Sequence, residues 1–183
     1  MQDLPKRNFR PGGFGPAQER AGRGPSTECA QRQVDSGWQY ATWWAEAKRA
    51  GATPTYLEFA TFTDTLNFNG TWKEQANVSL AEKFRKDRTD DDVFKEILVY
   101  LAAAPEGQYQ GSEARKNATL WKDQSLVDEK LDLLVFAYLV ARHLTKEHAV
   151  PFKLNTISRG GAILFGGGWV NGEKVRFQSP LQQ

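Results

Sequence analysis

The segment from Leu131 to Ala141 is apolar almost without interruption, and it constrains the fold more than any other stretch. It lies in the sequence SLVDEKLDLLVFAYLVARHL, which opens with a helix N-cap pattern at Ser125. A helix that is apolar nearly all round must be covered on several sides, as the central helix of a bundle or of an α+β core is. A membrane span needs about 20 apolar residues, so this stretch is too short to cross a bilayer.

Two helices are predicted before residue 70. Apolar residues recur at helical spacing from Val34 to Ala45 and predict a helix over 31–50, with Gly51 as its end. Thr53 followed by Pro54 is typical of an N-cap and a first helical residue, and predicts a second helix that runs through Ala60. The residues after Ala60 are rich in β-formers, so a strand is the alternative there.

Capping patterns predict the next helices. Ser79 and Glu82 form a capping-box pattern, and Thr89 precedes an acidic run that suits a helix N-terminus. The polar segment 106–124 is predicted to be a loop with a short helix over 114–120. With 183 residues, the chain fits one domain and a tail.

After Pro151 the pattern changes to the alternation of strands. Strands are predicted over 152–156, 163–165 and 169–177, and Asn171-Gly172 is typical of a type I′ hairpin turn. The glycine groups at 159–161 and 166–168 are interpreted as tight turns and bulges. We therefore predict an α+β fold: a mainly helical core of about four or five helices over 31–148, closed by a C-terminal antiparallel β-hairpin or three-stranded meander.

The N-terminal 28 residues have a different composition from the rest. They are rich in glycine, proline and arginine and poor in apolar residues, so we expect a disordered arm over 1–28 and a single globular domain over 29–183. Such an arm is typical of contacts with RNA, DNA or an acidic protein surface; a solubilising tail is the alternative. The net charge of +2 is too small to identify a nucleic-acid-binding protein by itself.

Aromatic and basic residues supply the candidate binding residues. Nine aromatic residues fall between Trp38 and Trp72, where they could stack on bases or form core. The segment from Lys83 to Arg88 holds the densest basic cluster after the arm, and the C-terminal strands could form a basic β-surface beside Trp169. The predicted nucleic-acid-binding residues are Arg7, Arg10, Arg20, Arg23, Trp43, Trp44, Lys83, Arg85, Lys86, Arg88, Arg159, Lys174 and Arg176.

The sequence AEAKRAGATPTYL at 45–57 resembles the helix-turn-helix of small transcriptional repressors. There, an alanine-rich helix meets a turn glycine and a Thr- or Ser-capped recognition helix. The resemblance implies that the recognition helix would direct four side chains toward the major groove of DNA, those of Thr53, Thr55, Tyr56 and Glu58. An ordinary helix hairpin is the alternative.

The favoured hypothesis is a non-enzymatic nucleic-acid-associated protein, with RNA and DNA both open and a homo-oligomer possible. The first alternative is a protein-interaction or assembly component, such as a virion or plasmid accessory protein, because Trp43 and Trp44 lie 100° apart on a helix and cannot share one narrow core stripe. The second is an enzyme whose site forms no sequence motif. Cys29 is the single cysteine, and no cofactor or metal site is expected. The N-terminus has no apolar signal region, so an intracellular or virion-associated location is expected.

Overall fold

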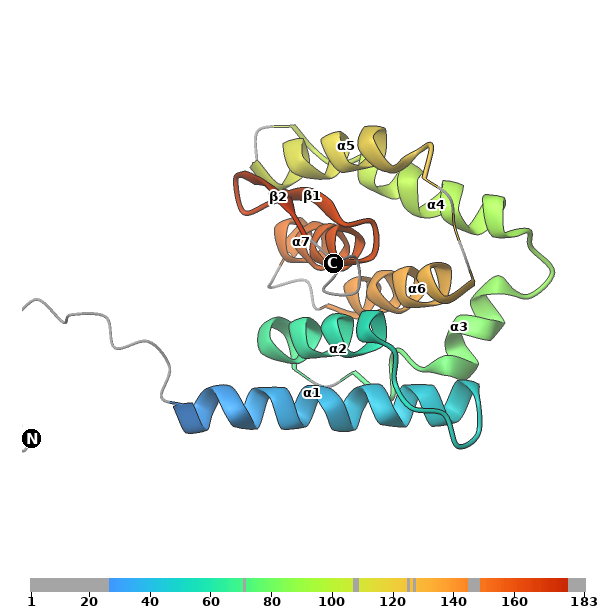
Figure 1. Cartoon of the computed structure of the whole chain (residues 1–183). Coiled ribbons are helices and arrows are strands. Elements are labelled where there is room, and N and C mark those ends of the chain that lie inside the picture. Colours follow the sequence, from blue (N-terminus) through green and yellow to red (C-terminus); the bar gives the residue numbers. More distant parts are fainter. Residues whose placement is uncertain are drawn as a thin grey trace, which may run out of the picture.

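The computed structural model describes residues 27–70, 72–106, 109–124, 126, 128–144 and 149–177 (Figure 1). These residues form a mainly helical fold that ends in an antiparallel two-stranded hairpin. The elements are α1 (Thr27–Lys48), α2 (Tyr56–Asn69), α3 (Val78–Arg85), α4 (Asp90–Ala102), α5 (Tyr109–Trp121), α6 (Asp128–His143), α7 (Ala149–Leu164), β1 (Gly167–Val170) and β2 (Glu173–Arg176). The described residues thus contain seven helices, more than the four or five predicted.

Helix α6 is the centre of the core, as its apolar sequence predicted. Every residue from Leu131 to Ala141 is buried. In Figure 1, α1 and α2 lie side by side below α6 and α7, and α4, α5 and the hairpin lie above them. Trp44, Phe62 and Phe136 form an aromatic cluster where α1, α2 and α6 meet, with ring centroids 4.8–5.5 Å apart. Among the described residues, no helix is long and apolar enough to cross a membrane.

The strands predicted over 152–156 and 163–165 are wrong, because 149–164 forms α7. The buried residues Leu154, Ile157 and Gly161 recur at helical rather than alternating spacing. Gly160 and Gly161 do not form a turn, because they lie within α7. Their lack of a side chain allows neighbouring elements to approach α7 closely. A Cβ added at Gly161 would lie 2.5 Å from the Trp121 ring, and one at Gly160 would lie 3.0 Å from Ala137 Cβ.

The predicted Asn171-Gly172 turn is confirmed. Both residues have positive φ, 52° and 91°, as a type I′ turn requires. The register pairs Val170 with Glu173 across this two-residue turn. The third strand of the alternative meander is absent from residues 149–177.

Several helix boundaries in the structure differ from the predicted ones. Helix α1 begins at Thr27, α2 begins after an N-cap at Thr55 and continues to Asn69, and α3 has its N-cap at Asn77 rather than Ser79. The strand alternative after Ala60 is therefore wrong, because the buried face of this segment packs on α1. The N-cap at Thr89 is confirmed: its hydroxyl accepts from the N–H of Asp92. Helix α5 spans 13 residues of the segment predicted to be mostly loop.

The helix-turn-helix expected from residues 45–57 is not formed. Helix α1 ends at Lys48 and α2 begins at Tyr56, so the connection is longer than the 3–4-residue turn of that motif. Glu58 does not face outward, because it is 1% exposed and accepts hydrogen bonds from the guanidinium of Arg49. The Thr55 hydroxyl donates to the Glu129 carboxylate of α6. Helices α1 and α2 are therefore an ordinary hairpin.

Candidate nucleic-acid interface

The tryptophans predicted to stack on bases are largely used in packing. Trp44 is 1% exposed and belongs to the aromatic cluster of the core. Trp43 is partly buried, with its ring 5.0 Å from Tyr40 and the ammonium of Lys73 4.8 Å from its centroid. Trp44 therefore has no face open to a base, whereas Trp43 stays partly exposed. Arg7, Arg10, Arg20 and Arg23 lie outside the described residues.

The two arginines of the basic cluster at 83–88 form ion pairs with carboxylates. Arg85 donates to the buried carboxylate of Asp132 in α6 and, at 2.7 Å, to Asp90. Burial lowers the pKa of Arg85, but the hydrogen bonds and charges of Asp132 and Asp90 outweigh this effect and raise its pKa above the ordinary arginine value. Arg88 pairs with Glu96 at 2.7 Å. Both guanidinium groups are thus held in ion pairs within the fold, and a contact of these arginines with phosphate stays a prediction.

Lys83 and Lys86 remain exposed beside those arginines. They line a shallow depression together with Arg85, Arg88, Glu82 and Asp90, and within the described residues neither lysine has a carboxylate at ion-pair distance. No described aromatic residue lines this depression, so it offers no ring on which a base could stack.

Arg159 also has a structural role. Its guanidinium makes a two-pronged ion pair with Asp64 of α2 and lies 3.5 Å from the centroid of the Phe68 ring. The pair joins α7 to α2, and both residues line a hollow with Val170, Glu173 and Val175, which lie on the face of the hairpin opposite Lys174 and Arg176. Arg159 belongs to α7 and not to a strand, and its binding of nucleic acid together with Lys174 and Arg176 stays a prediction.

The other predicted C-terminal residues do come together. Trp169 is the cross-strand partner of Lys174, and Gly167 is the partner of Arg176. Because strand side chains alternate, Trp169, Lys174 and Arg176 lie on one face of the hairpin, whereas Gly168 and Val170 are buried on the other. Trp169 is partly exposed, and Lys174 and Arg176 are exposed. We call this group, with Lys116, the hairpin face.

Lys116 of α5 was not among the predicted residues. Its ammonium lies 4.0 Å from the centroid of the Trp169 ring, within the range of a cation–π contact. Within the described part of the chain, Lys116, Lys174 and Arg176 have no carboxylate at ion-pair distance. The hairpin face therefore combines an aromatic ring with three cations that are not neutralised locally.

Helix α5 holds the hairpin through one row of side chains. Asn117 Nδ2 donates to the Trp169 carbonyl at 2.9 Å, and Asn117 Oδ1 accepts from the Trp169 N–H at 2.7 Å. Trp121 Nε1 donates to the Gly167 carbonyl at 2.9 Å, and the Glu113 carboxylate accepts from the Gly172 N–H. The three side chains are four residues apart, so they share one face of α5. These side chains hydrogen-bond to backbone groups of the hairpin that a third strand would otherwise pair with at the outer edge of β1.

The sequence signal for this row is weak. Glu113, Asn117 and Trp121 are buried at helical spacing, but two of them are polar and look like loop residues in a polar segment. Only their partners in the hairpin, more than 45 residues later, explain why they are buried.

A wide hollow lies elsewhere, between α2, the start of α6 and the end of α7. It has a volume of about 820 Å³ and a mixed lining, in which Phe59 and Phe165 lie together with the acidic residues Asp64 and Glu129. The pKa values of Tyr40, Tyr100 and Tyr138 are raised by burial, and none of these residues lines the hollow. Among the described residues, no three His, Cys, Asp or Glu side chains are placed to hold a metal ion.

Comparisons with protein-family models, with curated proteins and with solved structures found no match. The geometry of the chain is therefore the basis on which its function is argued.

Proposed function

We propose that this protein binds single-stranded nucleic acid, with the hairpin face as the site on its folded domain. The observation that carries the proposal is the Lys116 ammonium over Trp169, in a group of three cations without carboxylate partners. Proteins that bind single strands combine aromatic stacking platforms with a basic track for the phosphates. The hairpin face has both, whereas the depression at the 83–88 cluster is lined by no described aromatic residue and its two arginines are paired with carboxylates.

The arrangement suits a single strand better than a duplex. A base must be unstacked from its neighbours to lie on one tryptophan ring, and a flexible strand allows this at low cost. A base that stacks on Trp169 would displace the exposed Lys116 ammonium, which would then lie next to a phosphate. Lys174 and Arg176 are two residues apart along β2 and would contact the neighbouring phosphates.

The arm adds a contribution that does not depend on sequence. Arg7, Arg10, Arg20 and Arg23 carry charge that attracts any phosphate backbone. In this proposal the arm supplies general attraction, and the hairpin face supplies the contact with bases. The proposal covers both RNA and DNA, because no contact of the described residues would distinguish a strand that carries a ribose 2′-hydroxyl from one that lacks it.

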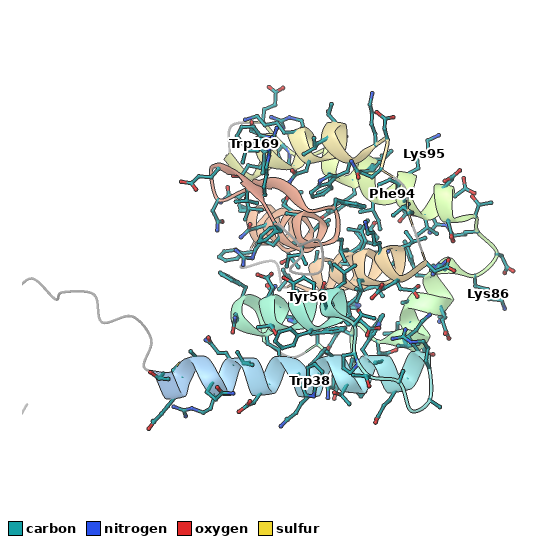
Figure 2. The ribbon with its side chains drawn as sticks, in the orientation of Figure 1. Trp38, Tyr56, Lys86, Phe94, Lys95 and Trp169 are labelled. Atoms are coloured by element: carbon teal, nitrogen blue, oxygen red, sulfur yellow. The ribbon has the colours of Figure 1, made fainter. Side chains whose placement is uncertain are left out.

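The test is fluorescence anisotropy of labelled oligo(dT) and oligo(rU) with the full chain. The site variant carries Lys116→Ala, Lys174→Ala and Arg176→Ala. The matched control carries Lys83→Ala, Lys86→Ala and Lys95→Ala, which removes the same charge from exposed residues of α3, α4 and the turn between them. Figure 2 shows Lys86 and Lys95 on the opposite side of the molecule from Trp169.

We expect the site variant to lose about tenfold or more in affinity and the control to change little. Trp169→Ala removes one stacking contact, worth about 1–3 kcal/mol per base, or roughly fivefold to a hundredfold in affinity. Equal losses in both triple variants would show attraction by net charge alone and would contradict a site on the hairpin. Replacing the four arm arginines by glutamine should weaken binding while leaving the effect of Trp169→Ala in place.

One observation favours a second candidate function, a role in protein–protein interaction or assembly. Val34, Trp38 and Tyr56 are 44%, 46% and 42% exposed on the neighbouring helices α1 and α2. Large apolar side chains that gather on a surface mark sites of interaction with other proteins.

A further inference from the structure

The exposed apolar side chains of α1 and α2 form one surface. The rings of Trp38 and Phe59 are 5.9 Å apart, and both line a depression of about 540 Å³ together with Val34. Tyr56 lies one helical turn before Phe59 and is exposed. Figure 2 shows Trp38 and Tyr56 on the two neighbouring helices. Tyr56 lines the neighbouring hollow between α2, α6 and α7, so we call the three apolar residues of the depression, Val34, Trp38 and Phe59, the α1–α2 aromatic surface.

Helix α1 extends this surface beyond the body of the domain. Its 22 residues make it about 33 Å long, and its N-terminal end projects past α2 in Figure 1. Ala30, Val34 and Trp38 are four residues apart and form a stripe along α1, and all three are exposed. Such a stripe is normally covered by another element, because it would otherwise leave apolar area in water.

Three carboxylates and one guanidinium group lie along the side of α1 next to this stripe. Glu28, Asp35 and Glu46 are spaced by seven and eleven residues, close to two and three turns, so they lie along one side of α1. Arg32 lies on the same side and donates to the Glu28 carbonyl at 3.3 Å, so the carboxylates outnumber the cation there. Asp35 itself lines the depression and accepts a hydrogen bond from the Gln31 amide at 2.8 Å. Within the described residues none of the three forms an ion pair.

These carboxylates decide which occupant fits. They would repel the phosphates of nucleic acid, so Trp38 is not part of the hairpin face's function. They would also oppose a second copy of the same helix, since two acidic flanks would come together. A partner with basic side chains would instead be attracted by these carboxylates.

We propose that the α1–α2 aromatic surface binds a basic amphipathic helix of a partner protein. The apolar face of that helix would enter the depression between α1 and α2 and cover Val34, Trp38 and Phe59. Its lysine and arginine side chains would lie against Glu28, Asp35 and Glu46. A helix fits because two packed helices leave a groove along their seam that a third helix fills. This inference is independent of nucleic-acid binding and requires none of the hairpin-face residues.

The test uses the full chain and two labelled synthetic helical peptides of leucine with lysine or leucine with glutamate, with leucine at the same helical positions in both. Anisotropy should show that the Leu/Lys peptide binds at least about tenfold more tightly than the Leu/Glu peptide. Trp38→Ala should lower the affinity for the Leu/Lys peptide by about tenfold or more. The triple variant Glu28→Gln, Asp35→Asn and Glu46→Gln should remove most of the discrimination between the peptides.

Matched controls are Val99→Ala for an exposed apolar residue of α4, and Glu74→Gln, Glu106→Gln and Asp123→Asn for three exposed acids elsewhere. These variants should leave peptide binding unchanged. Should Trp38→Ala fail to fold, Val34→Lys on the projecting part of α1 gives the same test. No preference for the Leu/Lys peptide, or equal losses in the controls, overturns the proposal. Self-association in sedimentation that Trp38→Ala abolishes would assign the surface to a second copy and also overturns it.

Discussion

Asn117 in α5 binds both backbone groups of Trp169 in β1, donating from Nδ2 to the carbonyl at 2.9 Å and accepting at Oδ1 from the N–H at 2.7 Å. A primary amide is the side chain that can donate and accept in this way. The contact fixes the strand against α5 and sets which face of Trp169 is open. It therefore links the stability of the hairpin to the proposed binding surface.

Replacing Asn117 by alanine should destabilise the protein by about 1–3 kcal/mol, because two backbone groups of Trp169 lose their partner in a buried place. Urea unfolding measures this change. Thr119→Ala is the control on the same helix, since that side chain is exposed, and should change the free energy of unfolding by less than about 0.5 kcal/mol. Asn117→Ala should also weaken oligonucleotide binding although it removes no charge. Unchanged stability would show that the amide does not hold the strand.

Asp132 should be essential for stability. Its carboxylate is 6% exposed and binds both Arg85 and, at 2.7 Å, Lys48. Asp132→Ala would leave these two cations without their buried partner, and we expect a loss of about 3–5 kcal/mol in chemical denaturation. Asp128→Ala is the matched control, because that carboxylate is 86% exposed and lies 3.4 Å from Arg85. A similar effect of both substitutions would contradict the assigned role of Asp132.

Gly161 should not tolerate a side chain. A Cβ there would lie 2.5 Å from ring carbons of Trp121, so Gly161→Ala must displace the ring that binds the Gly167 carbonyl. We expect a loss of about 1–3 kcal/mol by thermal unfolding. Gly160→Ala, where the nearest atom would be 3.0 Å away, should cost less. The reverse order would mean that α7 does not pack on Trp121 as described.

Alkaline pH should destabilise the protein through Tyr138. Burial, and then its hydrogen bond to Glu96, raise the pKa of Tyr138 from 10.0 to about 12. A raised pKa means that the folded state holds the proton more tightly, so this contribution to stability is complete below pH 10 and is lost as the pH rises toward 12. Unfolding followed between these pH values should show the decline, and Tyr138→Phe should make it shallower. A decline of the same slope in Tyr138→Phe would assign it to other groups, such as Tyr40 and Tyr100, whose pKa values are also raised.

Local sequence determined the elements whose signals come from neighbouring residues. The all-round apolar run at 131–141 predicts the central helix, and Thr89 with the acids after it predicts the start of α4. Asn171-Gly172 predicts the hairpin turn, because positive φ is a local requirement. In each case the physical cause lies within a few residues of the feature.

Tertiary structure decided the rest, because those features depend on residues far apart in the chain. The segment at 152–164 alternates like a strand, yet it forms a helix because its glycines let it pack on α6 and Trp121. The arginines at 85, 88 and 159 look available in the sequence and are paired with Asp132, Glu96 and Asp64 in space. The sequence alone placed Trp169, Lys174 and Arg176 on one hairpin. Only the packing of α5 against that hairpin brought Lys116 over the tryptophan, since a contact between segments more than 50 residues apart leaves no local pattern.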